Sequence, residues 1–256
     1  MNINIPNNYM EKYFEISAAQ TPPRYKGIAV LDEPFRKKYE EILARAKVDL
    51  GTVTPLQIHA AFFVDPNSGF ICVSSIKECL KDLGYNWLSR TLLAYVIAKC
   101  IANFTGETEN TITLNNIHKV IHPADSNILW TNTGGVCIDN FQKIAGFGSD
   151  GKFTFQDLKD MRAANYNHDE KKEFSGLFSA YLDAKKEFDL ALDLFADTTK
   201  NGERAISLET IAKIYLAGPQ AFEEAILRKR ETTKQAVGSG IVQSIKHIWQ
   251  NQKTYA

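Results

Sequence analysis

Four glycines recur in the linkers between helical segments, and their spacing restricts the fold more than any other feature of the chain. Gly69, Gly134, Gly151 and Gly202 each lie two to four residues before an apolar residue, with a helix expected soon after. A glycine turn, a short β-bridge and an exit helix are the parts of an EF-hand loop. The pattern predicts a mainly α-helical fold in which EF-hand-like helix-loop-helix units pair two by two.

The segments between these linkers carry apolar residues at helical spacing, together with start and stop signals such as Thr54-Pro55, Ser207, Gly84 and Gly218-Pro219. Residues 1–34 contain four prolines and no sustained period. We therefore expect an irregular N-terminal arm over residues 1–34 and a single helical domain over residues 35–256. The expected helices cover residues 35–46, 54–63, 74–83, 87–104, 113–121, 138–145, 155–165, 178–195, 208–217 and 220–230.

The composition excludes several classes of protein. With 44% hydrophobic and 23% charged residues the chain is an ordinary globular protein, and its formal net charge of +0 provides no field that would attract nucleic acid. Four cysteines without CxxC spacing do not form a zinc ribbon, and the N-terminus lacks a secretory signal. We expect a cytoplasmic protein without a nucleic-acid partner. The apolar stretch over 87–104 contains Arg90 and Lys99, so peripheral membrane contact is the most we expect of it.

The glycine-centred loops lack the ligands that calcium requires. A calcium loop carries oxygen ligands at positions 1, 3 and 5 and a bidentate Glu at position 12, with glycine at 6. Placing Gly69 or Gly134 at position 6 leaves no carboxylate among those four positions, and placing Gly151 there leaves Asp150 and Asp157. The last loop offers Asp197 but has its glutamate, Glu209, one place late. We predict degraded loops with no calcium site; polar turns that never held a metal fit the residues equally well.

Histidines are the remaining candidates for chemistry. His118 and His122 have the i, i+4 spacing at which two imidazoles on one helix share a face, and His59 follows Leu56 on an otherwise apolar face. Each has an ordinary alternative, as a hydrogen-bonded core residue or a solvated pair. The motifs HExxH, GxSxG and GxxxxGK[ST] are absent, which disfavours zinc proteases, α/β-hydrolases and P-loop NTPases.

Two histidine-containing motifs resemble those of the caleosin family of haem-dependent peroxygenases. Leu56-Gln-Ile-His-Ala-Ala-Phe-Phe, followed by Leu80-Lys-Asp-Leu-Gly-Tyr-Asn, is similar to the family's LQxHxxFF and LxxLGxN. Asn116-Ile-His-Lys-Val-Ile-His-Pro-Ala-Asp-Ser resembles its NIHKxxHGSDS in the same order. The resemblance covers roughly residues 53–227.

The resemblance implies a haem cofactor, with His59 and His122 at the positions of the family's haem-associated, iron-binding histidines and His118 at a nearby catalytic position. It also implies a hydroperoxide as oxygen donor, and hydroxylation or epoxidation of a lipophilic, unsaturated small-molecule substrate. We expect Phe62, Phe63, Ile117, Ile121, Leu88 and Leu92 to line the haem or lipid pocket, with ordinary core as the alternative.

The chain departs from the family at three places. The calcium ligands are lost, Gly106-Glu-Thr-Glu-Asn-Thr-Ile-Thr replaces the proline-rich membrane knot, and Pro123-Ala124 replaces Gly-Ser. We therefore expect, at most, peripheral contact with lipid droplets or the endoplasmic reticulum. Two alternatives stay open: a haem-free member that cyclises or isomerises a reactive metabolite, and a non-catalytic EF-hand-like module that binds an amphipathic helix.

Overall fold

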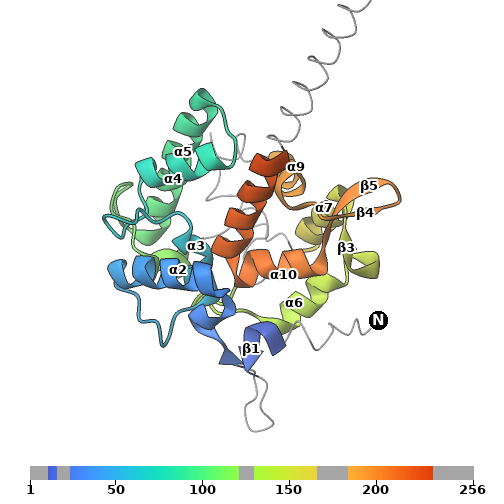
Figure 1. Cartoon of the computed structure of the whole chain (residues 1–256), viewed down its shortest axis with the longest axis horizontal. Coiled ribbons are helices and arrows are strands. Elements are labelled where there is room, and N and C mark those ends of the chain that lie inside the picture. Colours follow the sequence, from blue (N-terminus) through green and yellow to red (C-terminus); the bar gives the residue numbers. More distant parts are fainter. Residues whose placement is uncertain (1–10, 16–23, 121–129, 166–183, 233–256) are drawn as a thin grey trace, which may run out of the picture.

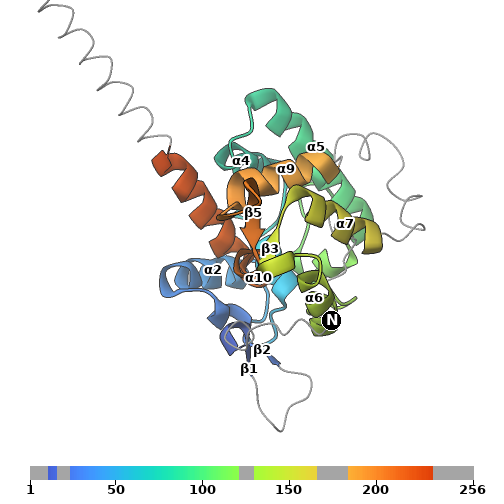
Figure 2. The same cartoon turned by 90° about the vertical axis from the view of Figure 1, so that its right-hand side faces the viewer.

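The computed structural model describes residues 11–15, 24–120, 130–165 and 184–232. Helices dominate it, as the sequence predicts, beside two small antiparallel sheets (Figures 1 and 2). In chain order the elements are β1 (Phe14–Glu15), β2 (Arg24–Tyr25), η1 (Gly27–Val30), α2 (Glu33–Arg45), α3 (Pro55–Ala61), α4 (Val73–Asp82), α5 (Trp87–Thr105), η2 (Leu114–Lys119), α6 (Ile138–Ala145), η3 (Ser149–Gly151), β3 (Lys152–Phe153), α7 (Phe155–Asn165), α9 (Ala184–Phe195), β4 (Thr198–Lys200), β5 (Glu203–Ser207), α10 (Leu208–Leu216) and a helix over 218–232.

The centre of the molecule is formed by α3, α10 and the helix over 218–232. In Figure 1, α10 runs across the middle of the molecule, and the red helix over 218–232 rises from its end. The short helix α3 packs against both α10 and η2, although the latter two lie about a hundred residues apart in sequence. Helices α4 and α5 pack side by side at one end of the molecule (Figure 2).

The glycine-centred linkers are turns, as predicted, but only two of them pair with each other. Gly69, Gly134, Gly151 and Gly202 all have positive φ values, which glycine adopts without a steric penalty. Strand β3 follows Gly151 and strand β5 follows Gly202, and the two strands pair in an antiparallel register. This pairing joins the third and fourth glycine units. Behind Gly69, in contrast, Ile71 bridges to Ile112, and the bridge behind Gly134 joins Val136 to Trp130 within its own loop. The expected pairing of the first two glycine units is therefore absent from the described bridges.

Most of the expected helices are present with bounds close to the prediction. The helix expected over 155–165 matches α7, and that over 208–217 matches α10, whose first turn is capped by Ser207 Oγ accepting from Thr210 N at 3.1 Å. The chain bends at Ala217, and Gly218-Pro219 begins the next helix. Only α9 is described within the segment expected over 178–195; residues 178–183 lie outside the described residues.

The helix predicted over residues 113–121 differs from the structure in both length and type. Residues 114–119 form the 3-10 helix η2, and Val120 is extended, with φ −81 and ψ 136. A 3-10 helix has three residues per turn, so it does not place residues i and i+4 on one face. His118 lies in η2, whereas His122 lies beyond its end and outside the described residues. The two histidines therefore do not lie on one face of a single helix.

The described part of the N-terminal arm packs on the core. Phe14 of β1 and Tyr13 just before it are buried, as are Val30 and Leu31 at the end of η1. Tyr25 of β2 stacks edge-on against Phe14, with 5.9 Å between the ring centroids, and donates its hydroxyl hydrogen to the backbone carbonyl of Leu216. The arm thus contacts the end of α10, which belongs to the centre of the fold.

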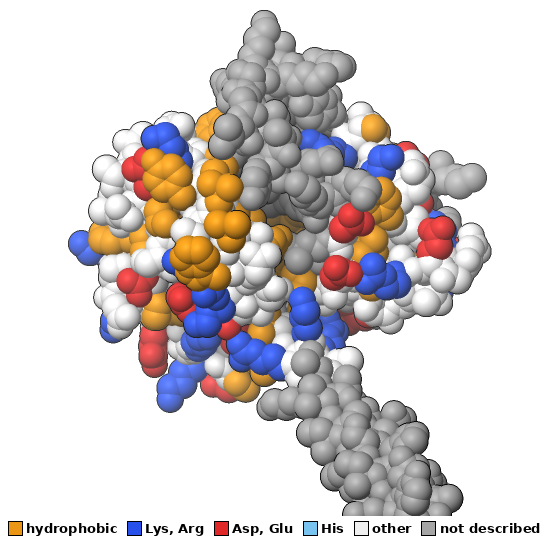
Figure 3. Space-filling view, turned by 90° about the horizontal axis from the view of Figure 1, so that it is seen from above, with side chains coloured by type: hydrophobic (Ala, Val, Ile, Leu, Met, Phe, Trp, Pro, Cys, Tyr) orange, Lys and Arg blue, Asp and Glu red, His pale blue; other side chains and the backbone are white. Residues whose placement is uncertain are grey.

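Helix α5 exposes an apolar face. Trp87 is 64% exposed and Leu88 is 69% exposed, and Leu92 and Tyr95 are also exposed. Hydrophobic side chains gather accordingly on the left of the face seen in Figure 3. Leu88 and Leu92, which the sequence predicts to line a haem or lipid pocket, lie on this exposed face. None of the helices in the described ranges combines the length and hydrophobicity needed to cross a membrane.

Candidate functional site

The first turn of α3 fixes where His59 lies. Thr54 Oγ1 accepts from Gln57 N at 3.2 Å, and Gln57 Oε1 accepts from Thr54 N at 2.9 Å, which forms a capping box. Pro55 occupies the first helical position, where its missing N–H is not needed. The cap sets the start of a helix of only seven residues, so it also sets the position of His59 in the last turn.

A backbone carbonyl orients the imidazole of His59. Nδ1 lies 2.9 Å from the carbonyl oxygen of Ile214 in α10. A carbonyl oxygen can only accept, so Nδ1 carries the hydrogen, and in the neutral ring Nε2 carries the lone pair. This is the arrangement of metal-ligating histidines, in which a hydrogen bond at one nitrogen fixes the tautomer of the other.

Gly218 allows this approach. A Cβ atom built on Gly218 would lie 2.7 Å from His59 Nδ1 and 2.9 Å from His59 Cα. Distances below about 3 Å are far inside carbon–carbon contact, so any larger residue would push the two backbones apart. Glycine at this corner therefore lets α10 and the helix over 218–232 press against the histidine.

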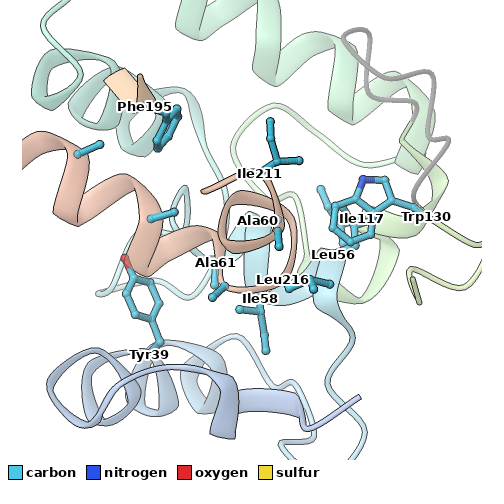
Figure 4. Packing of buried hydrophobic residues seen from close by; sticks show 14 of the residues in the cluster. Tyr39, Leu56, Ile58, Ala60, Ala61, Ile117, Trp130, Phe195, Ile211 and Leu216 are labelled. Atoms are coloured by element: carbon cyan, nitrogen blue, oxygen red, sulfur yellow. The ribbon is translucent and has the colours of Figure 1, made fainter. Parts of the chain in front are cut away.

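Aromatic rings surround His59. Its ring centroid lies 6.0 Å from that of Trp130 and 5.5 Å from that of Phe222. Phe222 in turn stacks on Phe62 at 4.8 Å. Figure 4 shows Trp130 beside Ile117 and Leu56, next to the end of α10. The remaining members of this aromatic cluster are Phe63, Phe195 and Tyr215. The surroundings of His59 are therefore apolar and rich in flat rings, which suit a planar or lipophilic ligand.

Helix η2, which carries His118, lies against the histidine helix. Gln57 Nε2 of α3 donates to the carbonyl of Leu114 at 3.4 Å, and Ile117 is buried. The contact expected between the first helix-loop-helix unit and the segment 113–122 is therefore present in the described part. His118 is half-buried. The roles of His59, His118 and His122 stay predictions.

Glu107 anchors the start of η2. Its carboxylate accepts from Thr113 Oγ1 at 2.7 Å, Thr113 N at 3.1 Å and Asn116 Nδ2 at 2.9 Å. Burial by itself would raise the pKa of Glu107, but the hydrogen bonds from Thr113 and Asn116 outweigh it and lower the pKa. The glutamate sits in the segment that departs from the family's proline knot, and it holds Asn116, the first residue of the second motif.

A buried amide fastens the corner between α10 and the helix over 218–232. Gln220, 1% exposed, accepts from Asp32 N at 2.9 Å and donates from Nε2 to the carboxylate of Asp32 and to Glu224 Oε1, the latter at 2.8 Å. Lys213 of α10 donates to Glu224 Oε1 at 2.7 Å. These bonds tie the N-terminal arm to the turn that presents Gly218 and Phe222 to His59.

Replacing Gln220 by leucine is expected to lower the free energy of unfolding by about 1–2 kcal/mol. The hydrogen bonds of Gln220 to Asp32 and Glu224 are lost, but the exposed Asp32 can bond to water instead. Urea unfolding measures the change. Gln156→Leu, at an exposed position of α7, is the control and should change the free energy by no more than about 0.5 kcal/mol. Equal effects of the two substitutions would contradict a structural role for Gln220.

An ion pair between a lysine and an aspartate joins the third and fourth glycine loops. Asp157, at position 12 of the loop around Gly151, accepts from Lys200 Nζ at 2.8 Å and from Thr154 N at 2.8 Å. Burial raises the pKa of Asp157, but the bonds from Lys200 and Thr154 outweigh this effect and lower it. The ammonium group supplies positive charge at this carboxylate, which supports the prediction that the loop does not bind calcium; that prediction stays untested.

The described side chains around His59 do not form a site for a bare metal ion. Within the described ranges, no three His, Cys, Asp or Glu side chains converge as an ion site would require. Haem iron needs only one or two axial ligands from the protein, and an imidazole of the His59 tautomer is a usual one.

Several residues of this site carry no signal in the sequence. The hydrogen-bond partner of His59 is the backbone carbonyl of Ile214, which no side-chain pattern reports. Gly218 is visible only as a helix stop, and Phe222 and Trp130 resemble ordinary core residues. The Gly-Pro pair could have indicated a close approach of two backbones, but it does not identify the partner.

Comparisons with known proteins agree with the motifs. The family model described as "Caleosin related protein" matches residues 51–215, which include α3, η2 and most of α10. No match was found among curated proteins or among solved structures. The matched segment covers more than half of the chain, and it contains both histidine motifs. The protein therefore belongs to the caleosin family.

Proposed function

We propose that this protein is a haem-dependent peroxygenase that transfers oxygen from a hydroperoxide to a lipophilic, unsaturated substrate. The observation that carries the proposal is the hydrogen bond from His59 Nδ1–H to the carbonyl of Ile214. It fixes the imidazole so that Nε2 is the nitrogen that would hold the iron of the cofactor, and His59 matches a haem-associated histidine of the family. The surrounding aromatic cluster supports a lipophilic ligand at the same place.

The protein's own residues would contribute binding, orientation and proton transfer. His59 would hold the cofactor through Nε2, and the Ile214 carbonyl would increase the basicity of that ligand. His122, outside the described residues, matches the family's second haem-associated position. His118 would accept the hydroperoxide's proton and return it to the departing oxygen. The haem itself would supply the redox chemistry that cleaves the O–O bond.

Reconstitution with haem tests the proposal. The wild-type protein is expected to bind haem stoichiometrically with a Soret band and to oxidise an unsaturated fatty acid when given a hydroperoxide. His59→Ala and His122→Ala should each lose the Soret band, because a histidine that would hold the haem is missing, and added imidazole should restore the band in His59→Ala. His118→Ala should keep haem but lose rate, by about 10²-fold or more.

His168, which lies outside both motifs, provides the matched control: His168→Ala should retain haem and activity. A folded wild-type protein that shows no Soret band after haem supplementation would overturn the proposal. Turnover of a reactive metabolite by such haem-free protein would favour the cyclase or isomerase alternative.

A further inference from the structure

Helix α5 is apolar on nearly every side. Of its 19 residues, only Arg90 and Lys99 carry a charge. Its inner side packs against α4, and Leu93, Ala94 and Ala98 are buried there. A helix that is hydrophobic all round is normally covered all round, because each apolar side chain gains from leaving water. The outer side of α5 is therefore a candidate contact surface.

Four side chains form this surface, which we call the outer face of α5: Trp87, Leu88, Leu92 and Tyr95. All four are exposed, and Trp87 stays 64% exposed although Lys77 Nζ lies 6.0 Å from its ring centroid. Their positions i, i+1, i+5 and i+8 lie along one side of a helix. Eight steps of about 1.5 Å make this stripe about 12 Å long.

The described part of the chain ends beside the start of the outer face. Near the end of the helix over 218–232, Arg230 pairs with Asp82 at 2.6 Å, and Lys229 Nζ donates to the carbonyl of Leu83 at 3.2 Å. Helix α5 begins four residues after Leu83. The chain beyond position 232 therefore continues from a point near the first turn of α5.

Residues 241–249 carry an apolar stripe of the same length. Residues 233–256 lie outside the described residues, so the stripe is read from the sequence alone. Its members lie at i, i+1, i+4, i+7 and i+8, and they are Ile241, Val242, Ile245, Ile248 and Trp249. The residues between them are polar, which is the pattern of an amphipathic helix with one apolar face. This stripe also covers eight steps, or about 12 Å.

The connection between position 232 and the stripe is long enough to bring the two apolar surfaces together. Residues 233–240 span up to about 26 Å when extended, about twice the length of the outer face. They contain no proline, and they end in Gly238-Ser239-Gly240, a sequence that lets the chain reverse its direction. Residues 241–249 can therefore lie along α5 from either end.

We propose that residues 241–249 form a helix that packs its apolar stripe on the outer face of α5 within the same molecule. The connection of eight residues holds the segment near this face at an effective concentration of about a millimolar, which a second copy of the chain does not reach in dilute solution. The contact involves neither His59 nor haem, so its test is independent of the proposed peroxygenase activity.

Photo-crosslinking of the full chain tests the contact directly. Trp249→p-benzoylphenylalanine places the reactive group in the apolar stripe, and trypsin divides the outer face between peptides 82–90 and 91–99. Irradiation is expected to join residue 249 to one of these peptides, in protein that runs as a monomer. Gln243→p-benzoylphenylalanine places the same group on the opposite side of the expected helix, and it should give little of this product.

A second measurement reads the cover from the side of α5. Hydroxyl-radical oxidation of Trp87 and Tyr95 should rise several-fold in Ile245→Asp, because a carboxylate in the centre of the stripe displaces the segment. Gln243→Asp adds the same charge on the polar side and should leave the oxidation unchanged. Neither position belongs to the described core, so both variants are expected to fold, which circular dichroism checks.

Three results would overturn the proposal. A crosslink that appears only at the mass of a dimer would assign the outer face to a second copy of the chain. Oxidation of Trp87 that falls only when phospholipid vesicles are added, and equally in both aspartate variants, would assign the face to a membrane. Control variants that act as strongly as the stripe variants would show that residues 241–249 do not recognise α5.

Discussion

Gly218→Ala is expected to destabilise the protein by about 3 kcal/mol and to disturb the imidazole of His59. The added methyl would lie 2.7 Å from His59 Nδ1 and 2.9 Å from its Cα, so a rotamer change of the histidine cannot relieve the overlap. Overpacking of a tight site typically costs about 1–3 kcal/mol, and contact with backbone leaves little room to relax. Urea unfolding measures the loss of stability, and ¹⁵N NMR of the histidine ring nitrogens reports whether Nδ1 keeps its hydrogen.

Gly51→Ala is the matched control. A Cβ there would meet only the side chain of Asp49, at 3.4 Å, in an exposed turn. Its effect on the free energy of unfolding should stay within about 1 kcal/mol of zero. If Gly218→Ala unfolds at the same urea concentration as Gly51→Ala and keeps the wild-type nitrogen shifts, the close packing of the two backbones at His59 is refuted.

Lys200→Met is expected to lower the free energy of unfolding by about 2–3 kcal/mol at neutral pH. The substitution keeps most of the apolar side chain but leaves the carboxylate of Asp157, 18% exposed, without its cation. Removal of one partner from a buried ion pair costs about 3–5 kcal/mol, and the residual exposure of this pair reduces that figure. Lys37→Met, at an exposed position of α2, is the control and should have little effect.

The pH dependence identifies the cause of this loss. The pKa of Asp157 is lower in the folded protein than in the unfolded chain, where it is about 3.9. The ionised carboxylate therefore adds its full amount to the free energy of unfolding above about pH 3.9, and this stabilisation is lost as the pH falls through the folded pKa. The difference in stability between wild type and Lys200→Met should therefore narrow below about pH 4. A difference that stays constant down to pH 2 would show that lost packing, rather than the ion pair, is responsible.

The helices and turns follow from local chemistry, and this explains why they could be predicted. Thr54-Pro55 and Ser207 satisfy the free N–H groups of a first helical turn within three residues, so the starts of α3 and α10 are encoded beside them. The glycines at 69, 134, 151 and 202 allow the positive φ that their turns require. The failure at 113–121 also has a local cause: η2 adopts the tighter 3-10 winding, which apolar spacing does not distinguish over six residues.

The sequence by itself determined the helical class, the positions of the turns and the two histidine motifs that relate the chain to its family. Tertiary structure decided which elements meet: β3 with β5, Ile71 with Ile112, and His59 with Ile214 and Gly218, which lie more than 150 residues away. Caps and turns depend on neighbours along the chain, and so they leave a pattern in the sequence. The environment of His59 depends on a backbone carbonyl and a missing side chain, which become a site only when the chain folds back on itself.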